Sequence, residues 1–74
     1  MKFLSDKEAL KQLGKRVVAL RKEHEMSQAD LSYEADIDLS TLSRLERGGL
    51  NIGYITLHKI AKGLNISMKD LLDF

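Results

Sequence analysis

The sequence predicts an all-α fold, a compact bundle of about five helices in a single domain that spans residues 1–74. Three observations predict it. Apolar residues recur at steps of three and four, no segment alternates apolar and polar residues as a strand does, and helix-start patterns precede the apolar stripes. A chain of this length buries only about 60% of its unfolded surface, so we expect one small core.

The first predicted helix is long and amphipathic. Ser5 and Glu8 match a capping box, in which the serine accepts a backbone hydrogen bond and the glutamate reaches back to the serine N–H. An apolar stripe at helical spacing follows directly after this pattern. The stripe consists of Leu10, Leu13, Val17, Leu20 and His24. We therefore expect one helix, starting just after Ser5, whose apolar side covers the other elements.

Two short helices are predicted next. Ser27 and the acid three residues later repeat the capping pattern, and they start a helix that runs to about Ala35. Asp38 is placed to cap the following helix, which is expected over about Leu39–Arg47. Gly48-Gly49 end that helix, because glycine readily adopts the backbone conformation that terminates a helix.

Two further helices complete the prediction. One is expected from about Tyr54 to Lys62, with Gly63 near its end. Ser67 starts the last helix by the same capping pattern, and we expect this helix to continue to the end of the chain. One serine–acid match would mean little, because it often occurs by chance. Three matches that each precede an apolar stripe support the helical assignment.

The junction of the second and third predicted helices is the most informative feature. Only residues 36–38 separate them, so the two helices must pack at a steep angle. This packing is expected to bury Leu31 and Ala35 against Leu42 and Leu45, with Ile37 in the corner. Helices this short are unstable alone, so the first and fourth helices must support them. The arrangement is a helix-turn-helix, whose second helix is free to enter a DNA major groove.

The third helix separates its apolar and basic residues. At about 100° per residue, Leu42 and Leu45 face the core. The opposite side carries two arginines, two hydroxyls and no acid, as a surface that faces DNA should. This side consists of Ser40, Ser43, Arg44 and Arg47, with Leu39 at its edge and Glu46 on the flank toward the core. A solvated surface helix with no partner can also carry such a side, so the pattern alone leaves both interpretations open.

Two segments of the chain match a known family. Ser27-Gln28-Ala29-Asp30-Leu31 is followed by Thr41-Leu42-Ser43-Arg44-Leu45-Glu46-Arg47-Gly48. At this separation the two segments resemble the Cro/C1-type, or XRE-like, helix-turn-helix regulators. The resemblance covers about residues 13–72, with the motif itself at about 27–47. It implies a lambda-repressor-like domain that binds double-stranded DNA and regulates transcription.

The resemblance also implies roles for individual residues. The base-reading positions are Leu39, Ser40 and Arg44. Positions that contact the DNA backbone or flanking bases are Ser27, Gln28, Thr41, Ser43, Arg47 and Asn51. Gln28 is also expected to brace the recognition helix, and Arg21 and Glu46 match a partly buried structural ion pair. The family often has glycine in the turn where this chain has Asp36, a residue that tolerates a left-handed backbone.

A homodimer is expected, because one recognition helix contacts too few base pairs to select one site among ~10⁶–10⁹ competitors. The family binds near-palindromic operators as twofold dimers. In a chain of this length we expect the dimer interface on the helical domain itself. Candidate interface residues are Leu50, Ile52, Tyr54, Ile55, Leu71, Leu72 and Phe74. Several of these residues could instead belong to the core, and Leu71 and Ile55 fit a core position best.

Composition limits the other function classes. Cysteine is absent, and His24 and His58 have no metal-site or nucleophile spacing, so we expect no metal, no cofactor and no enzyme. We expect no membrane segment and a cytoplasmic, nucleoid-associated location in a bacterium. Residues 25–46 carry one basic residue against six acids, which leaves an antitoxin-like protein-interaction module as an alternative. A restriction–modification controller and a phage or mobile-element repressor both remain open.

Overall fold

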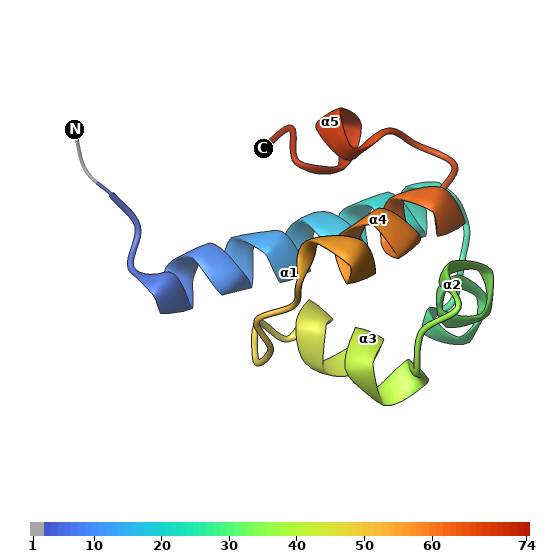
Figure 1. Cartoon of the computed structure of the whole chain (residues 1–74), viewed down its shortest axis with the longest axis horizontal. Helices are drawn as coiled ribbons and strands as arrows, with labels where there is room; N and C mark the ends of the chain where they lie inside the picture. Colours follow the sequence, from blue (N-terminus) through green and yellow to red (C-terminus); the bar gives the residue numbers. More distant parts are fainter. Residues whose placement is uncertain (1–2) are drawn as a thin grey trace.

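The computed structural model describes residues 3–74, which form five α-helices and, within that range, no strand. The helices are α1 (Asp6–Glu23), α2 (Gln28–Ala35), α3 (Leu39–Glu46), α4 (Tyr54–Gly63) and α5 (Met68–Leu71) (Figure 1). α1 packs against α3, α2 packs against both α3 and α4, and α5 packs against α4. The predicted all-α class is confirmed.

The first two helices begin where the capping pattern predicts. Ser5 and Glu8 form a complete capping box at the start of α1, and Ser27 and Asp30 form another at the start of α2. In each box the serine hydroxyl accepts from the backbone N–H of the acid, and the carboxylate accepts from the serine N–H. Local sequence therefore sets the start of both helices.

The later helix ends differ from the prediction. Asp38 occupies the N-cap position of α3, but its carboxylate makes no capping hydrogen bond. Ser67 accepts from the Asp70 N–H at the start of α5, yet this helix ends at Leu71 and does not continue to the chain end. So short a helix has little stability of its own, and packing sets its length.

The turn between α2 and α3 uses a left-handed residue. Asp36 has φ 56° and ψ 51°, and its N–H donates to carbonyls in the last turn of α2. The next N–H, that of Ile37, donates to the Ser32 carbonyl at 3.0 Å. An aspartate therefore performs the role that glycine often has at a helix end. Figure 1 shows α2 end-on and α3 lying across the view, so the two helices meet at a steep angle as predicted.

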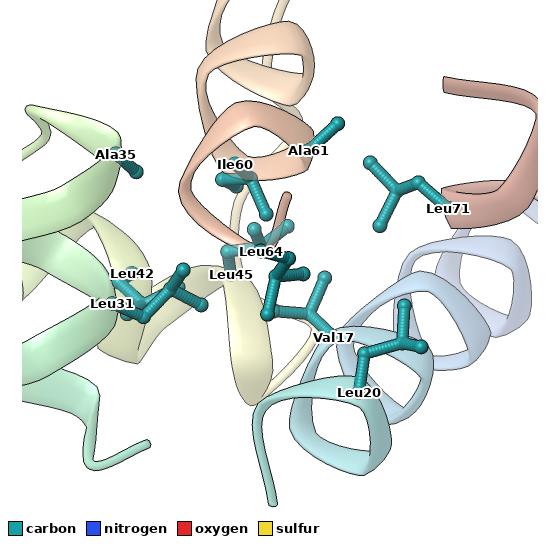
Figure 2. Close-up of a cluster of buried hydrophobic side chains, with 10 residues drawn as sticks. All are labelled: Val17, Leu20, Leu31, Ala35, Leu42, Leu45, Ile60, Ala61, Leu64 and Leu71. Atoms are coloured by element: carbon teal, nitrogen blue, oxygen red, sulfur yellow. The ribbon is translucent and has the colours of Figure 1, made fainter. Parts of the chain in front are cut away.

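One apolar core joins all five helices (Figure 2). Its buried side chains are Val17, Leu20, Leu31, Ala35, Leu42, Leu45, Ile60, Ala61, Leu64 and Leu71. Leu31 and Ala35 of α2 meet Leu42 and Leu45 of α3 in it, and Ile37 is half-buried against it. The core therefore fixes one side of α3, which determines which side remains exposed.

Gly14 places α1 directly behind the C-terminal end of α3. A Cβ atom on Gly14 would lie 2.6 Å from the carbonyl oxygens of Leu45 and Glu46, so only glycine permits this approach. At the opposite side of α1, Arg16 holds α5. Its Nη2 donates to the Asp70 carbonyl at 2.7 Å, and its Nε donates to the Leu71 carbonyl at 3.2 Å. These bonds satisfy carbonyls at the end of a very short helix.

Candidate nucleic-acid interface

The outer side of α3 is open to solvent. Ser40, Arg44 and Arg47 are exposed, and Leu39 is 48% exposed at the helix start. The opposite side, with Leu42 and Leu45, is completely buried. The backbone of this short helix is thus anchored from behind, while Arg44 and the C-cap residue Arg47 are exposed to solvent.

The distribution of charge also distinguishes the outer side of α3 from the inner side. Among residues 3–74 neither Arg44 nor Arg47 has a carboxylate within ion-pair distance, and Arg21 with Glu46 forms the salt bridge. Glu46 is the acid of α3, and it points back toward α1. A cationic side without a neighbouring acid attracts phosphate and can donate to base edges.

Arg21 ties α1 to α3 by a bidentate contact. Its Nε donates to Glu46 Oε2 at 2.8 Å, its Nη2 donates to Glu46 Oε1 at 3.0 Å, and its Nη1 donates to the Met26 carbonyl at 2.9 Å. The two side chains are only 12% and 4% exposed. The hydrogen bonds that Arg21 donates to the Glu46 carboxylate raise the pKa of Arg21, so its guanidinium stays charged. This contact fixes the distance between α1 and α3.

Gln28 joins the same carboxylate. Its Nε2 donates to Glu46 Oε1 at 2.8 Å, which connects the first residue of α2 to the last residue of α3. The Gln28 side chain thus braces α3, and it lies beside the N-terminal end of α2. There the backbone N–H groups of Gln28 and Ala29 have no partner among residues 3–74. Such N–H groups bind phosphate well.

The remaining predicted DNA contacts lie at the edges of the outer side. Ser43 and Thr41 are half-buried, and Asn51 is exposed in the loop after α3. Thr41 does not point with the arginines. It faces an open groove of about 570 Å³ between α2, the turn and α4. Asn51 instead borders a recess of about 270 Å³ beside the first turns of α1. The outer side therefore centres on Ser40, Arg44 and Arg47.

A comparison with protein families decides what this arrangement is. The helix-turn-helix family model matches residues 17–71, most of the chain. The chain belongs to the helix-turn-helix family. Membership supports a DNA-binding regulator. The expected Cro/C1-type resemblance is confirmed.

Curated relatives of this helix-turn-helix protein are control proteins. It is 39% identical over 62 residues to the control protein C.BamHI of Bacillus amyloliquefaciens, covering 82% of this chain and 76% of that protein. It is 34% identical over 59 residues to the control protein C.MunI of a Mycoplasma species, covering 78% of this chain and 80% of that protein. Both relatives match over most of their length.

Solved structures give the same result. The restriction–modification controller C.AhdI from Aeromonas hydrophila superposes with a TM-score of 0.85 at 29% identity, covering 88% of this chain and 98% of that one. The wild-type controller C.Esp1396I superposes with a TM-score of 0.81 at 30% identity, covering 86% and 84% of the two chains. The helix-turn-helix fold of this chain is thus the fold of these controllers.

The candidate dimer residues fall into three groups. Tyr54 and Ile55 are each 65% exposed at the start of α4, and Leu72 and Phe74 are 44% and 58% exposed near the C-terminus. Leu50 and Ile52 are half-buried, and Ile52 packs against the core. Leu71 has no exposed surface and cannot contact a partner, so its inclusion was wrong. Ile55 also fitted a core position in the sequence, but its side chain is exposed and lies outside the core.

Two residues that hold α1 against its neighbouring helices have structural roles that the sequence did not predict. Gly14 interrupts an otherwise apolar and charged helix, and an isolated glycine in a helix often marks close packing. Arg16 gives no such pattern, because its partners are two backbone carbonyls more than fifty residues away. Only the folded chain brings these groups together.

Within residues 3–74, no group of three histidine, cysteine or acidic side chains is arranged to hold a metal ion. Over the same residues, no helix combines the length and apolarity needed to cross a membrane. His24 caps the C-terminal end of α1 and His58 lies on α4, and both are exposed.

Proposed function

We propose that this chain is a sequence-specific transcriptional regulator that binds double-stranded DNA through α3 as the controller of a restriction–modification operon. The exposed arginine side of α3, fixed by the buried side behind it, carries this proposal. The similarity to C.BamHI and to the controller C.AhdI favours a controller over a phage or mobile-element repressor. An autoregulatory role in the bacterial cytoplasm follows from that assignment.

Arg44 is the proposed principal base-reading residue. Its guanidinium is exposed, and a bidentate contact to the O6 and N7 atoms of guanine gives ~1–3 kcal/mol of discrimination. Leu39, about half exposed at the helix start, suits the methyl group of thymine. The hydroxyl of Ser40 can donate or accept, so it discriminates weakly. A half-site with a guanine and a thymine in the major groove is therefore expected.

The flanking groups are proposed to hold the DNA backbone. Near the C-terminal end of α3, where Gln28 contacts Glu46, Ser27 and the free N–H groups at the start of α2 would bind a phosphate. Arg47, directly after α3, and Asn51, in the following loop, would contact the backbone as well. Thr41 and Ser43 are proposed to contact flanking bases or backbone from the edges of α3. Such contacts fix the register of the helix without specifying sequence.

A homodimer is the proposed active form. Tyr54, Ile55, Leu72 and Phe74 expose large apolar side chains on α4 and the C-terminal segment. Exposed apolar residues of this size are typical of a contact surface. A twofold dimer would present two copies of α3 to half-sites about one helical turn apart on a near-palindromic operator.

Selection of bound DNA from a random double-stranded pool tests this proposal. We expect enrichment of one near-palindromic site whose half-sites are centred ~10–10.5 base pairs apart. Binding should also weaken steeply with added salt, since phosphate contacts release counterions. A pool without enrichment at low salt would contradict the proposal and favour a protein-interaction role for the same fold.

The dimer has its own test. Ile55→Ser removes an exposed apolar side chain without touching the core, so the monomer should remain as stable as the parent chain. Sedimentation equilibrium should show weaker self-association of this variant. Lys62→Ser, an exposed substitution farther along α4, provides the control. Equal association of parent, Ile55→Ser and control would remove this surface from the proposal.

A further inference from the structure

The long helix α1 carries a stripe of lysines that the proposed function does not use. At about 100° per residue, these lysines fall within an arc of about 80°. The stripe, called the lysine ridge below, consists of Lys7, Lys11, Lys15 and Lys22. All four side chains are exposed, and within residues 3–74 none of them forms an ion pair. Glu8 and Glu23 of the same helix lie outside this arc, and Glu8 is held by Ser5.

Close contacts place the ridge beside α3. Gly14, next to the ridge on the helix surface, lies against the carbonyls of Leu45 and Glu46. Lys11 itself lies against Gly48, because a Cβ there would be 2.9 Å from Lys11 Cα and 2.8 Å from Lys11 Cγ. The ridge therefore runs past the C-terminal end of α3 and the loop that follows it. In Figure 1 the first turns of α1 extend beyond that end of α3.

This position matters once α3 occupies a major groove. A helix with its side chains is about 10–12 Å wide, and the groove is about 12 Å wide and 8.5 Å deep. The helix thus fills the groove, and the sugar–phosphate walls rise on both sides of it toward the element behind. Packed helices lie about 8–10 Å apart, so α1 reaches the level of these walls where it passes the end of α3.

We infer that the lysine ridge is a second DNA-contacting surface, which binds backbone phosphates outside the base pairs that α3 reads. The inference rests on the proposed function, since α3 must first dock in the groove. Exposed lysines without acidic partners bind phosphate as mobile point charges and carry no base preference. The ridge would therefore raise affinity for DNA that extends past the operator, without changing which operator is chosen.

A pair of matched double variants tests this inference. Lys11→Gln with Lys15→Gln removes two charges from the ridge, and Lys62→Gln with Lys69→Gln removes two exposed charges from α4 and α5. The two proteins have equal net charge. Binding is measured from about 50 to 200 mM salt, on the minimal selected operator and on the same operator with extended flanks.

The ridge variant should lower the magnitude of the logarithmic salt slope on extended DNA by about 1.8, since each lost phosphate contact contributes about 0.9. It should also lose the gain in affinity that extended flanks give to the parent. The site selected from a random pool should stay the same. The salt slope of the α4–α5 variant should differ from that of the parent by less than about half of the slope that one phosphate contact contributes.

Two outcomes would overturn the inference in distinguishable ways. If the parent selects an operator and both double variants have its salt slope, the ridge does not contact DNA, and the role of α3 is unaffected. If the parent selects no DNA at all, the proposed function fails, and the ridge fails with it. Circular dichroism melting of each variant checks that the exposed substitutions leave the fold intact.

Discussion

The arginines on the two sides of α3 lie in different environments. On the inner side, Arg21 of α1 meets Glu46 with two hydrogen bonds and is almost buried. On the outer side, Arg44 and Arg47 have no such partner among residues 3–74 and are exposed. A buried, paired guanidinium fixes a distance between helices, whereas an exposed one remains available to a ligand. Position relative to the core therefore decides which arginines stabilise the fold and which remain accessible to a ligand.

This comparison separates two kinds of substitution. Inner-side changes should lower the free energy of unfolding, and they should weaken DNA binding only as far as they unfold the protein. Outer-side changes should alter DNA binding and leave stability within about 0.5 kcal/mol of the parent.

The largest effect is expected from Glu46→Ala. It removes the carboxylate that Arg21 and Gln28 share, and it leaves a nearly buried guanidinium with the Met26 carbonyl alone. We expect the free energy of unfolding to fall by ~3–5 kcal/mol, measured by urea denaturation. Glu34→Ala, an exposed acid on α2, serves as control and should change it by less than about 0.5 kcal/mol. Equal effects of the two variants would refute a structural role for the pair.

Gly14→Ala tests the close approach of α1 and α3. The added methyl group would meet two backbone carbonyls at 2.6 Å, which cannot move without shifting α3. The resulting overpacking should cost ~1–3 kcal/mol, although alanine is otherwise the better helix former by roughly 1 kcal/mol. Thermal or urea unfolding measures the change.

Gly49→Ala is the matched control for this prediction. A Cβ atom there would meet the Arg44 carbonyl at an ordinary 3.6 Å, so the variant should stay within about 1 kcal/mol of the parent. A Gly14→Ala variant as stable as Gly49→Ala would contradict the close packing of α1 against α3 at Gly14.

The smallest effect concerns pH. The backbone N–H of Ser27 donates to Asp30 and lowers the pKa of this carboxylate below its ordinary value. Its stabilising contribution should be complete above the unfolded-state pKa of about 3.9, and it should disappear as pH falls through the lower folded-state pKa. The difference in unfolding free energy between the parent and Asp30→Asn should therefore shrink between about pH 5 and pH 2.5. A difference independent of pH would contradict the capping-box account.

Sequence predicted the parts of the fold that local chemistry controls. The starts of α1 and α2 follow from serine–acid capping boxes. The α2–α3 turn follows from the short connection between two apolar stripes. The pairing of Arg21 with Glu46 was implied by the family resemblance, and the structure contains it. In each case a short-range pattern or a family motif specifies the geometry.

The features that sequence did not predict depend on packing between distant segments. Leu71 and Ile55 have the same apolar character in sequence, yet α5 folds back so that Leu71 is buried, while Ile55 is left outside. The end of α5 is set by its packing and by the Arg16 contact, not by a stop residue. Similarly, Asp38 does not cap α3 although its type and position suit that role.

Affinity measurements on variants of the operator show whether the outer side of α3 reads DNA sequence. The affinities of the parent, Arg44→Ala and Arg47→Ala are measured on the selected operator and on each of its single base-pair variants. Arg44→Ala should lose preference at one guanine per half-site, by ~1–3 kcal/mol, with an unchanged melting temperature. Arg47→Ala should weaken binding on all sequences alike. If both variants bind every operator as the parent does, α3 does not read DNA with this side.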